Sequence, residues 1–354
     1  VIDGKTYSWP ITGPQLGSIL YYNKDVLKNA GLDPEKPPKT WDELREMAKI
    51  VTEQGGGDVF GLVFGGGDSG IENFVSAFAE GLSPEEGRGF NYKTGRYSYD
   101  SAAIQEAFDF LLQLKEDGSI LPSSYTLRAS ESGVLFGQGK AAFLIDGRAR
   151  MWIVKRDTPD ANYGLAQVPT KDGSDPTYHY VLANPTGYTI SASSKHPEEA
   201  GLFIERAFAA PMFYEKYLNS GVALTPIESI NTNKALYPYP EFDTFMHLHT
   251  KLLRVRPDYA IRNPETAQVI VELGALGQPK IKPGFKDILQ SVLSGAEKDA
   301  ASLLKDYNEK LNKGLEEAVA KVQASGVNVS LDDFAFPNWD PSKNYTEADY
   351  NALK

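Results

Sequence analysis

The chain has no cysteine among its 354 residues and only four histidines. Without cysteine it can form no disulfide, no thiol nucleophile and no cysteine-ligated zinc site. No stretch approaches 18 consecutive apolar residues, so the sequence predicts no membrane-spanning helix. The net charge is −11, with acidic residues spread along the chain. This excess of negative charge argues against nucleic acid as a partner.

The length and composition indicate a compact protein with two lobes or domains. A chain of 354 residues is long for one core, and an apolar content of 41% excludes wholesale disorder. The opening "VIDGKTYSWP" has neither an initiator methionine nor a signal region, and it reads like the middle of a domain. We therefore expect the natural start of the protein to lie elsewhere.

Strand-like and helical patterns alternate along the chain, which predicts an α/β fold. Thr40 and Glu43 have the spacing of a capping box and mark the start of one helix. Further helices are predicted around 104–112, around Trp152, after Pro197, and from Ser294 to about Ser325. Strands are predicted at 18–24, 59–64, 141–146, 163–169 and 187–191. The irregular aromatic tail is expected to pack onto the body.

Two glycine-rich segments resemble catalytic or nucleotide-binding motifs only in part. Residues 67–70 read Gly-Asp-Ser-Gly, as around a serine protease nucleophile, but no histidine stands in a recognisable triad context. Residues 137–140 read Gly-Gln-Gly-Lys, yet Ala141 follows where a phosphate-binding loop needs serine or threonine. Lys140 is therefore expected to face solvent at a turn.

No metal site or catalytic pair is indicated. His247 and His249 are two residues apart and would point to different faces of a helix. The adjacent carboxylates of residues 85–86 and 332–333 fit a solvated surface better than acid–base catalysis. We predict no enzymatic reaction, no metal and no cofactor.

Aromatic residues give the clearest hint of function. They make up 11% of the chain, including 19 tyrosines. Flat rings combined with planar Asn, Asp and Arg groups suit polyhydroxylated ligands. The alternative that each ring only anchors a core or a loop stays open. The rings that stand beside glycine, proline or asparagine are Trp9, Tyr188, Tyr237, Tyr239 and Trp339.

Several segments together resemble the family 1 extracellular solute-binding proteins of ABC importers. The most specific is "ILYYNKDVLKNAGLDPEKPPKTWDEL" within residues 4–44. The other matching blocks are 136–152 with 162–170, and 187–209 with 219–230, in family order. The tail "DFAFPNWDPSKNYT" is similar to larger, lipoprotein-type members of Gram-positive bacteria, many of which serve oligosaccharide uptake.

The resemblance implies a periplasmic-binding-protein-like clamp of two α/β lobes (class II type), which closes on a ligand. It implies that residues 1–18 are a remnant of the first lobe and that 19–182 form the second. Residues 183–262 would return to the first lobe, while 263–354 would pack mainly on the second. The resemblance further implies that the N-terminal part of the first lobe is absent from this chain, so the remnant is expected to expose apolar surface, bind ligand weakly and be able to dimerise.

The implied function is that of a substrate-binding subunit of an ABC transporter, which captures a carbohydrate, expected to be an oligosaccharide, and delivers it to the permease. The implied location is extracellular, on the outer face of the cytoplasmic membrane, through a lipid anchor in a preceding segment. Two alternatives are a glycan-active hydrolase with two facing carboxylates, and a sensory or adhesion protein that uses the same clamp.

The resemblance also places candidate ligand-binding residues. In maltose-binding members a Trp stacks on the sugar at the position of Ala149, which here is flanked by Arg148 and Arg150. That departure leaves room for an acidic sugar, since a guanidinium can bind a carboxylate in bidentate fashion; an outer-face location of both arginines stays open. The predicted ligand-binding residues are Trp9, Gln15, Gly66, Asp68, Asp146, Arg148, Asn184 and Tyr188.

Overall fold

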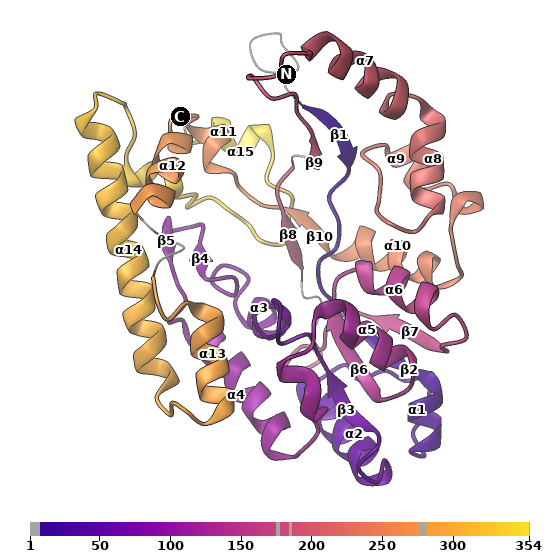
Figure 1. Cartoon of the computed structure of the whole chain (residues 1–354). Helices are drawn as coiled ribbons and strands as arrows, with labels where there is room; N and C mark the ends of the chain where they lie inside the picture. The colour runs from indigo at the N-terminus through magenta and orange to yellow at the C-terminus, as the bar shows by residue number, and fades with distance from the viewer. Residues whose placement is uncertain (1–7, 175–177, 184–185, 277–280, 354) are drawn as a thin grey trace.

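The computed structural model (Figure 1) describes residues 8–174, 178–183, 186–276 and 281–353. Its central element is a four-stranded sheet in the order β3-β6-β2-β7. β3 and β6 are parallel, whereas β2 is antiparallel to both of its neighbours, β6 and β7. The strands are β2 (Ile19–Asn23), β3 (Phe60–Val63), β6 (Ala141–Asp146) and β7 (Tyr163–Ala166).

Strand β2 is buried on both faces, and alternate side chains enter two different cores. Leu20 and Tyr22 pack in one apolar cluster, and Ile19 and Tyr21 in another. This follows from the two-residue period of a strand, which sends successive side chains to opposite faces. The first cluster contains residues of α1 (Lys24–Asn29), α2 (Trp41–Gln54), α3 (Gly70–Leu82), α4 (Ala102–Glu116) and α13 (Phe285–Ser294).

The second cluster covers the opposite face of the sheet. It contains residues of α5 (Ala129–Gly137), α6 (Ala149–Asp157), α8 (Pro211–Asn219), α9 (Glu228–Asn231) and α10 (Glu241–Leu252). Residues between 214 and 252 therefore share a core with the central sheet. The predicted division of the chain between two lobes stays a prediction.

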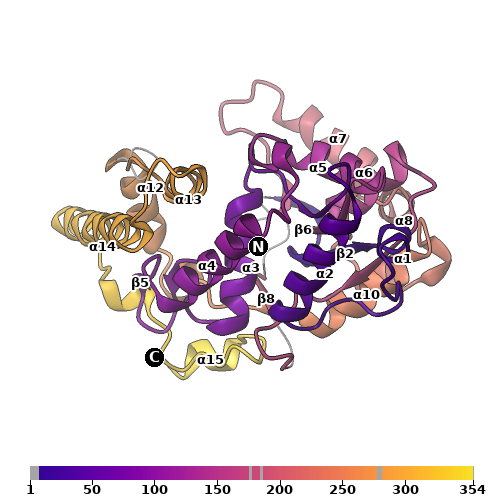
Figure 2. The same ribbon diagram turned by 90° about the horizontal axis from the view of Figure 1, so that it is seen from below.

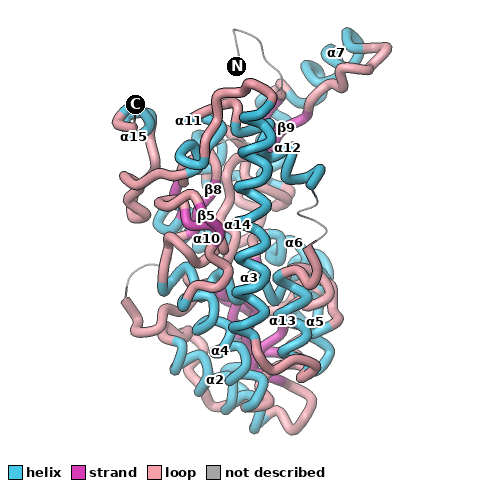
Figure 3. The backbone as a smooth tube through the Cα atoms, turned by 90° about the vertical axis from the view of Figure 1, so that its left-hand side faces the viewer, coloured by secondary structure: helices cyan, strands magenta, loops and turns pink. Residues whose placement is uncertain are grey.

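A separate two-stranded ribbon lies beyond one end of the sheet. β1 (Trp9–Thr12) pairs antiparallel with β9 (Thr186–Tyr188), and α7 (Pro197–Phe208) follows β9 in the chain. Figure 3 shows α7 projecting from one end of the molecule. None of its residues is buried, and Phe203 is 63% exposed. The apolar residues Leu202 and Phe203 of this helix are thus open to solvent.

The C-terminal part forms a layer of helices on the other side, at the left of Figures 1 and 2. Its elements are α11 (Tyr259–Arg262), α12 (Thr266–Leu276), α13, α14 (Ala300–Ala324) and α15 (Glu347–Asn351). The short parallel pair β8 (His179–Val181) and β10 (Leu253–Val255) lies between this layer and the β1–β9 ribbon. None of the helices in the described ranges is long and apolar enough to cross a membrane.

The aromatic tail packs onto the body, as predicted. Phe336, Trp339 and Tyr345 are buried in one cluster with Tyr180 of β8. The tail also closes the outer side of β10: Val255 N–H donates to Asn344 Oδ1 at 2.9 Å, and Tyr345 N–H donates to the carbonyl of Val255 at 2.8 Å. Tail and β10 therefore form a continuous set of hydrogen bonds.

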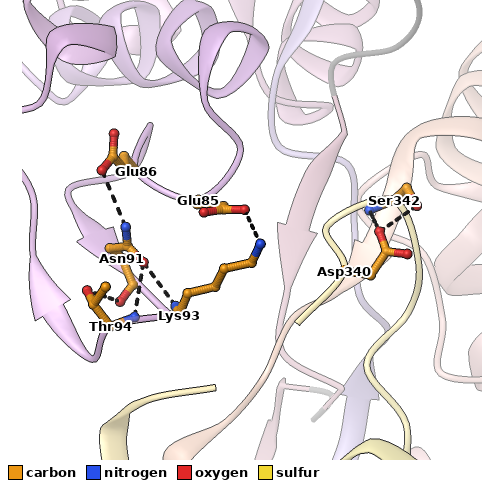
Figure 4. A network of polar contacts seen from close by, with 7 residues as sticks. All are labelled: Glu85, Glu86, Asn91, Lys93, Thr94, Asp340 and Ser342. Atoms are coloured by element: carbon orange, nitrogen blue, oxygen red, sulfur yellow. Dashed lines mark hydrogen bonds and ion pairs between the residues drawn. The ribbon is translucent and has the colours of Figure 1, made fainter. Parts of the chain in front are cut away.

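The hairpin of β4 (Phe90–Asn91) and β5 (Arg96–Tyr97) is fixed by a polar turn (Figure 4). Asn91 Oδ1 accepts from the N–H groups of Lys93 and Thr94, at 3.0 and 3.2 Å. Lys93 Nζ pairs with Glu85 at 2.5 Å, and Glu86 accepts from Asn91 Nδ2 at 3.3 Å. The adjacent carboxylates thus hold the turn in place, in addition to meeting solvent.

The predicted elements agree with the structure except at several boundaries. The capping box at Thr40 is present, and Trp41, Leu44, Ala48 and Val51 form the buried face of α2. The predicted helix from Ser294 to about Ser325 is present but starts later: α13 ends at Ser294, Gly295 adopts φ 80°, and α14 runs from Ala300 to Ala324. Helix α1 was not predicted, because its residues directly follow the β-rich run of β2. The predicted strands at 163–169 and 187–191 are shorter, ending at Ala166 and Tyr188.

Candidate functional site

Two of the predicted ligand-binding segments meet at one edge of the sheet. Because β3 and β6 are parallel, their carboxyl ends lie at the same edge. The glycine loop 65–69 follows β3, and residues 146–148 end β6 and lead into α6. In open α/β sheets, ligands bind in the crevice outside the carboxyl ends of the strands. This edge is therefore the candidate site.

The glycines of the loop are required by its packing against residues 124–129. A Cβ on Gly66 would lie 2.7 Å from the carbonyl oxygen of Ser124, and one on Gly65 would lie 2.6 Å from Ala129. The N–H of Gly66 donates to Ser124 O at 2.8 Å, and its carbonyl accepts from Gln290 Nε2 at 2.9 Å. The backbone of Gly66 is thus used within the protein, and close loop packing by itself accounts for the glycine run.

Asp146 is held at the end of β6 by a guanidinium. Arg150 Nε lies 3.2 Å from Asp146 Oδ2, and both side chains are 14% exposed. Asp146 Oδ1 also accepts from the N–H of Gly147 at 2.6 Å. Burial raises the pKa of Asp146, Arg150 and the Gly147 N–H oppose this rise, and Asp68 adds to it. Asp68 is therefore close enough to Asp146 for its charge to raise the pKa of that carboxyl group.

Asp68 itself is exposed and has a structural partner. Its Oδ2 accepts from the N–H of Ala129 at 2.8 Å, at the start of α5. A carboxylate there satisfies one of the unpaired N–H groups of the first helical turn. Asp68, in the loop after β3, and Asp146, the last residue of β6, thus lie at the same edge, the first exposed and the second nearly buried.

Arg148 is buried and links α6 to two distant segments. It is 6% exposed, donates from Nε to Gln15 Oε1 at 2.6 Å and from Nη1 to the carbonyl of Gly221 at 2.5 Å. Burial lowers its pKa, and the nearby tyrosines 239, 21 and 217 oppose this effect. Neither Arg148 nor Arg150 lies on the outer face, so that alternative is wrong for both.

Trp9 and Tyr188 face each other as a cross-strand pair on the β1–β9 ribbon. Trp9 Nε1 donates to the hydroxyl of Tyr214 at 3.0 Å, and this hydroxyl donates to the carbonyl of Pro10 at 2.6 Å. Tyr188 is 52% exposed and packs against Phe208, with ring centroids 5.2 Å apart. Of the two rings, Tyr188 offers the larger free surface.

The predicted residues thus fall into three groups: Trp9 with Tyr188, Gln15 with Arg148, and Gly66 with Asp68 and Asp146 at the carboxyl edge of the sheet. Beside Gln15 lies a groove of about 340 Å³, which is lined by residues 12–15, 180–182 and Arg256. Asn184 lies outside the described residues. Whether the three groups contact one ligand stays a prediction.

Sequence reasoning missed several partners of these residues. Arg150 stands four residues after Asp146, a spacing that can signal an ion pair, although here it spans a strand end and a helix start. Lys286, which donates to the carbonyl of Gly67 at 2.5 Å, gave no local signal because it lies on the distant α13. Among the other aromatic candidates, Tyr239 and Trp339 are buried core rings.

The histidines predicted not to bind metal lie on α10. His247 is exposed, whereas His249 is half-buried and its Nδ1 has no hydrogen-bond partner. Within the part of the chain that the structure describes, no group of three His, Cys, Asp or Glu side chains could hold a metal ion.

Comparison with known proteins agrees with this architecture. The sequence profile of the family described as "Bacterial extracellular solute-binding protein" matches residues 1–211. The chain belongs to this family. A curated relative in Brucella abortus (strain 2308), the sn-glycerol-3-phosphate-binding periplasmic protein UgpB, is 30% identical over 186 residues. That match covers 49% of this chain and 38% of the relative, so the chain spans well under half of the relative's length.

Solved structures show the same fold for this solute-binding protein. A chitin oligosaccharide binding protein has a TM-score of 0.66 at 21% identity, covering 88% of this chain and 73% of that one. An ABC transporter solute-binding protein from Thermotoga lettingae, bound with alpha-D-tagatose, has a TM-score of 0.63 at 20% identity, covering 89% and 74%. At such identities the similarity shows the fold alone: two-lobed, α/β and periplasmic-binding-protein-like.

Proposed function

We propose that this solute-binding protein captures a carbohydrate between its lobes and delivers it to the permease of an ABC importer, without catalysing a reaction. The observation that carries the proposal is the position of Asp68 and Asp146 at the carboxyl edge of β3 and β6, where Arg150 pairs with Asp146. Carboxylates and guanidinium groups pair with dense hydroxyls, and the exposed ring of Tyr188 can stack on an apolar sugar face.

The size of the ligand and its charge are open to measurement. The family match, the tagatose-bound solute-binding protein and the chitin oligosaccharide binding protein support a carbohydrate. The relative that binds sn-glycerol-3-phosphate supports an anionic ligand as the second candidate. Arg148 is the residue that favours it, although two of its donors already serve Gln15 and Gly221. An extracellular site of action and a lipid anchor belong to this proposal too.

The test is a thermal-shift and calorimetric screen at pH 7 with malto-, chito- and raffinose-type oligosaccharides, monosaccharides and sn-glycerol-3-phosphate. A ligand that binds only the folded state raises its stability, by about 2.7 kcal/mol at a hundred times the Kd. Asp146→Asn should reduce this shift, and Lys140→Gln, at the opposite end of β6, should leave it unchanged.

Chromatography of the recovered glycan separates binding from hydrolysis. The proposal expects the sugar to be returned intact after long incubation. Release of a shorter product would favour the hydrolase, with Asp68 and Asp146 as its first candidates. A sensory or adhesion role would be favoured if the bound protein failed to stimulate any ABC permease in reconstituted vesicles.

A further inference from the structure

A pocket of about 620 Å³ lies between the C-terminal tail and the end of β10, and we call it the tail pocket. One wall consists of residues between 255 and 262, in β10 and α11, and the other of residues between 345 and 353, in the tail and α15. The walls meet where Asp258 N–H donates to the hydroxyl of Tyr350 at 2.8 Å, and Figure 1 shows α11 and α15 near the C-terminus. The volume is that of a small-molecule site.

The guanidinium groups of Arg256 and Arg262 line the tail pocket, and within the described ranges neither forms an ion pair. In a chain with a net charge of −11, a guanidinium without a carboxylate partner is unexpected. Two such groups beside one cavity give it a local positive charge. The arginines that do pair with carboxylates are Arg45, Arg88, Arg96, Arg150 and Arg156.

Both guanidiniums are held in place by contacts that leave donors free. The guanidinium carbon of Arg256 lies 4.7 Å from the ring centroid of Tyr92, and that of Arg262 lies 5.6 Å from the ring centroid of Phe336. Each group also donates one hydrogen bond from Nη1, Arg256 to the carbonyl of Pro257 at 3.0 Å and Arg262 to a carbonyl of the tail. A ring engages the positive charge without accepting from every N–H, so further donors remain for a ligand.

The carboxylates of the tail pocket limit the charge of that ligand. Asp258 Oδ1 accepts from the N–H of Ala260 at 2.9 Å, and Asp333 Oδ2 accepts from the N–H of Ser330 at 2.7 Å, so both hold helix starts. Glu347 lies in the first turn of α15 and is exposed. Three carboxylates around two guanidiniums repel a doubly charged phosphate more than a singly charged carboxylate.

The remaining lining is apolar or aromatic. It includes Val255, Ile261 and Leu353 together with the rings of Tyr345 and Tyr350. Ile261 is 49% exposed, so a ligand in the pocket would cover an apolar side chain that now meets solvent. A carboxylate group alone is far smaller than the pocket. The lining therefore fits a carboxylate that carries an apolar body.

We propose that the tail pocket binds a monocarboxylic acid with an aromatic ring or a short apolar chain. The carboxylate is bound by Arg262 and Arg256, because a guanidinium pairs with a carboxylate through two parallel hydrogen bonds. The apolar body lies against Ile261 and Tyr350. This site is additional to the carbohydrate site, and it does not depend on the proposed function.

The test is a ligand-observed NMR titration of the whole chain with 3-phenylpropionate at pH 7 and low ionic strength. We expect a Kd of about 1 mM or below. The neutral 3-phenylpropionamide has the same shape and should bind at least about tenfold more weakly. Inorganic phosphate should not displace the acid. Equal binding of acid and amide, or displacement by phosphate at an equal concentration, overturns the proposal.

Charge variants place the acid in the tail pocket. Arg256 also lines the groove beside Gln15, whereas Arg262 does not, so Arg262→Met is the variant of choice. It should weaken binding by at least about tenfold, while Arg206→Met, an exposed arginine on α7, should leave binding unchanged. An unchanged affinity in a folded Arg262→Met protein overturns the proposal.

Two exposed positions keep the test decisive if Arg262→Met fails to fold. Glu347→Gln removes a repelling charge and should tighten binding about two- to fivefold, against no change for Glu53→Gln on α2. Ile261→Ala should weaken binding about threefold, against no change for Val271→Ala, which is 74% exposed on α12. If neither Glu347→Gln nor Ile261→Ala alters the affinity, the acid does not occupy the tail pocket.

Competition separates this site from the carbohydrate site. The carbohydrate identified in the thermal-shift screen should leave the acid bound. Competitive displacement of the acid by that carbohydrate would place both ligands in one site and overturn the proposal. A protein that binds the acid but no carbohydrate refutes the proposed function and leaves the tail pocket supported.

Discussion

Replacing Arg148 should destabilise the fold itself, beyond any effect on ligand binding. The side chain is 6% exposed and provides donors to Gln15 Oε1 and Gly221 O. Arg148→Met leaves both acceptors without this donor, at about 1–3 kcal/mol each. Part of that cost is recovered, because burying a guanidinium is itself unfavourable. We therefore expect a net loss of about 2–4 kcal/mol in the free energy of unfolding.

Urea denaturation followed by far-ultraviolet circular dichroism at pH 7 measures this loss. The control is Arg156→Met on the same helix: its guanidinium is half-exposed and pairs with Asp157, so the change should stay below about 1 kcal/mol. A cycle with Gln15→Ala should give a coupling of about 1–2 kcal/mol. An Arg148→Met protein within about 0.5 kcal/mol of wild type, at an unchanged denaturant slope, would contradict the reasoning.

Three further predictions concern pH, a helix cap and the glycine loop. Burial lowers the pKa of His179 and lowers that of His249 to about 4. Below about pH 6.5 the unfolded state therefore binds more protons than the folded state, and the free energy of unfolding should fall with decreasing pH, by up to about 1.4 kcal/mol per pH unit for each histidine. The fall should be smaller where Glu80 or Asp146, whose pKa values are raised by burial, takes up a proton in the folded state. Melting curves between pH 4 and 8 check this, and His249→Gln should flatten the slope. Thr40→Ala removes the capping box of α2 and should cost about 1 kcal/mol in urea denaturation, against less than about 0.5 for Thr250→Ala, whose hydroxyl donates to the carbonyl of Met246 one turn earlier in the same helix. Asp68→Ala should weaken ligand binding by about 1–3 kcal/mol in calorimetry, and unchanged affinity would remove Asp68 from the site.

Local patterns in the sequence were sufficient for most of the secondary structure. Thr40 and Glu43 marked the start of α2, and the spacing of Trp41, Leu44, Ala48 and Val51 identified its buried face, because both signals act within a few residues. The start of α14 was predicted too early, at Ser294, although Gly295, a common helix end, stands directly after it. The apolar stripe that identified this helix begins at Leu304 and therefore does not mark its first turn.

The candidate site was harder to predict, because its contacts are long-range. The sequence Arg-Ala-Arg at 148–150 shows that the segment is charged but not that Arg148 is buried. The two partners of Arg148 are distant in the chain: Gly221 is more than 70 residues away, and Gln15 is more than 130 residues away. Similarly, the glycines at 65–67 suggested a ligand, whereas residues 124–129 supply the crowding that requires them. Only the resemblance to a family brought these segments together before the fold was known.

The tail that covers β10 has a practical meaning for anyone preparing this protein. Residues 344–345 occupy both backbone groups of Val255 on the outer side of a two-stranded pair. An uncovered strand edge is a template for pairing with another chain. A sample cleaved by a protease just before Asn344 would thus aggregate more readily than the whole protein. Turbidity would reveal this cleavage more readily than the small change of mass on a gel.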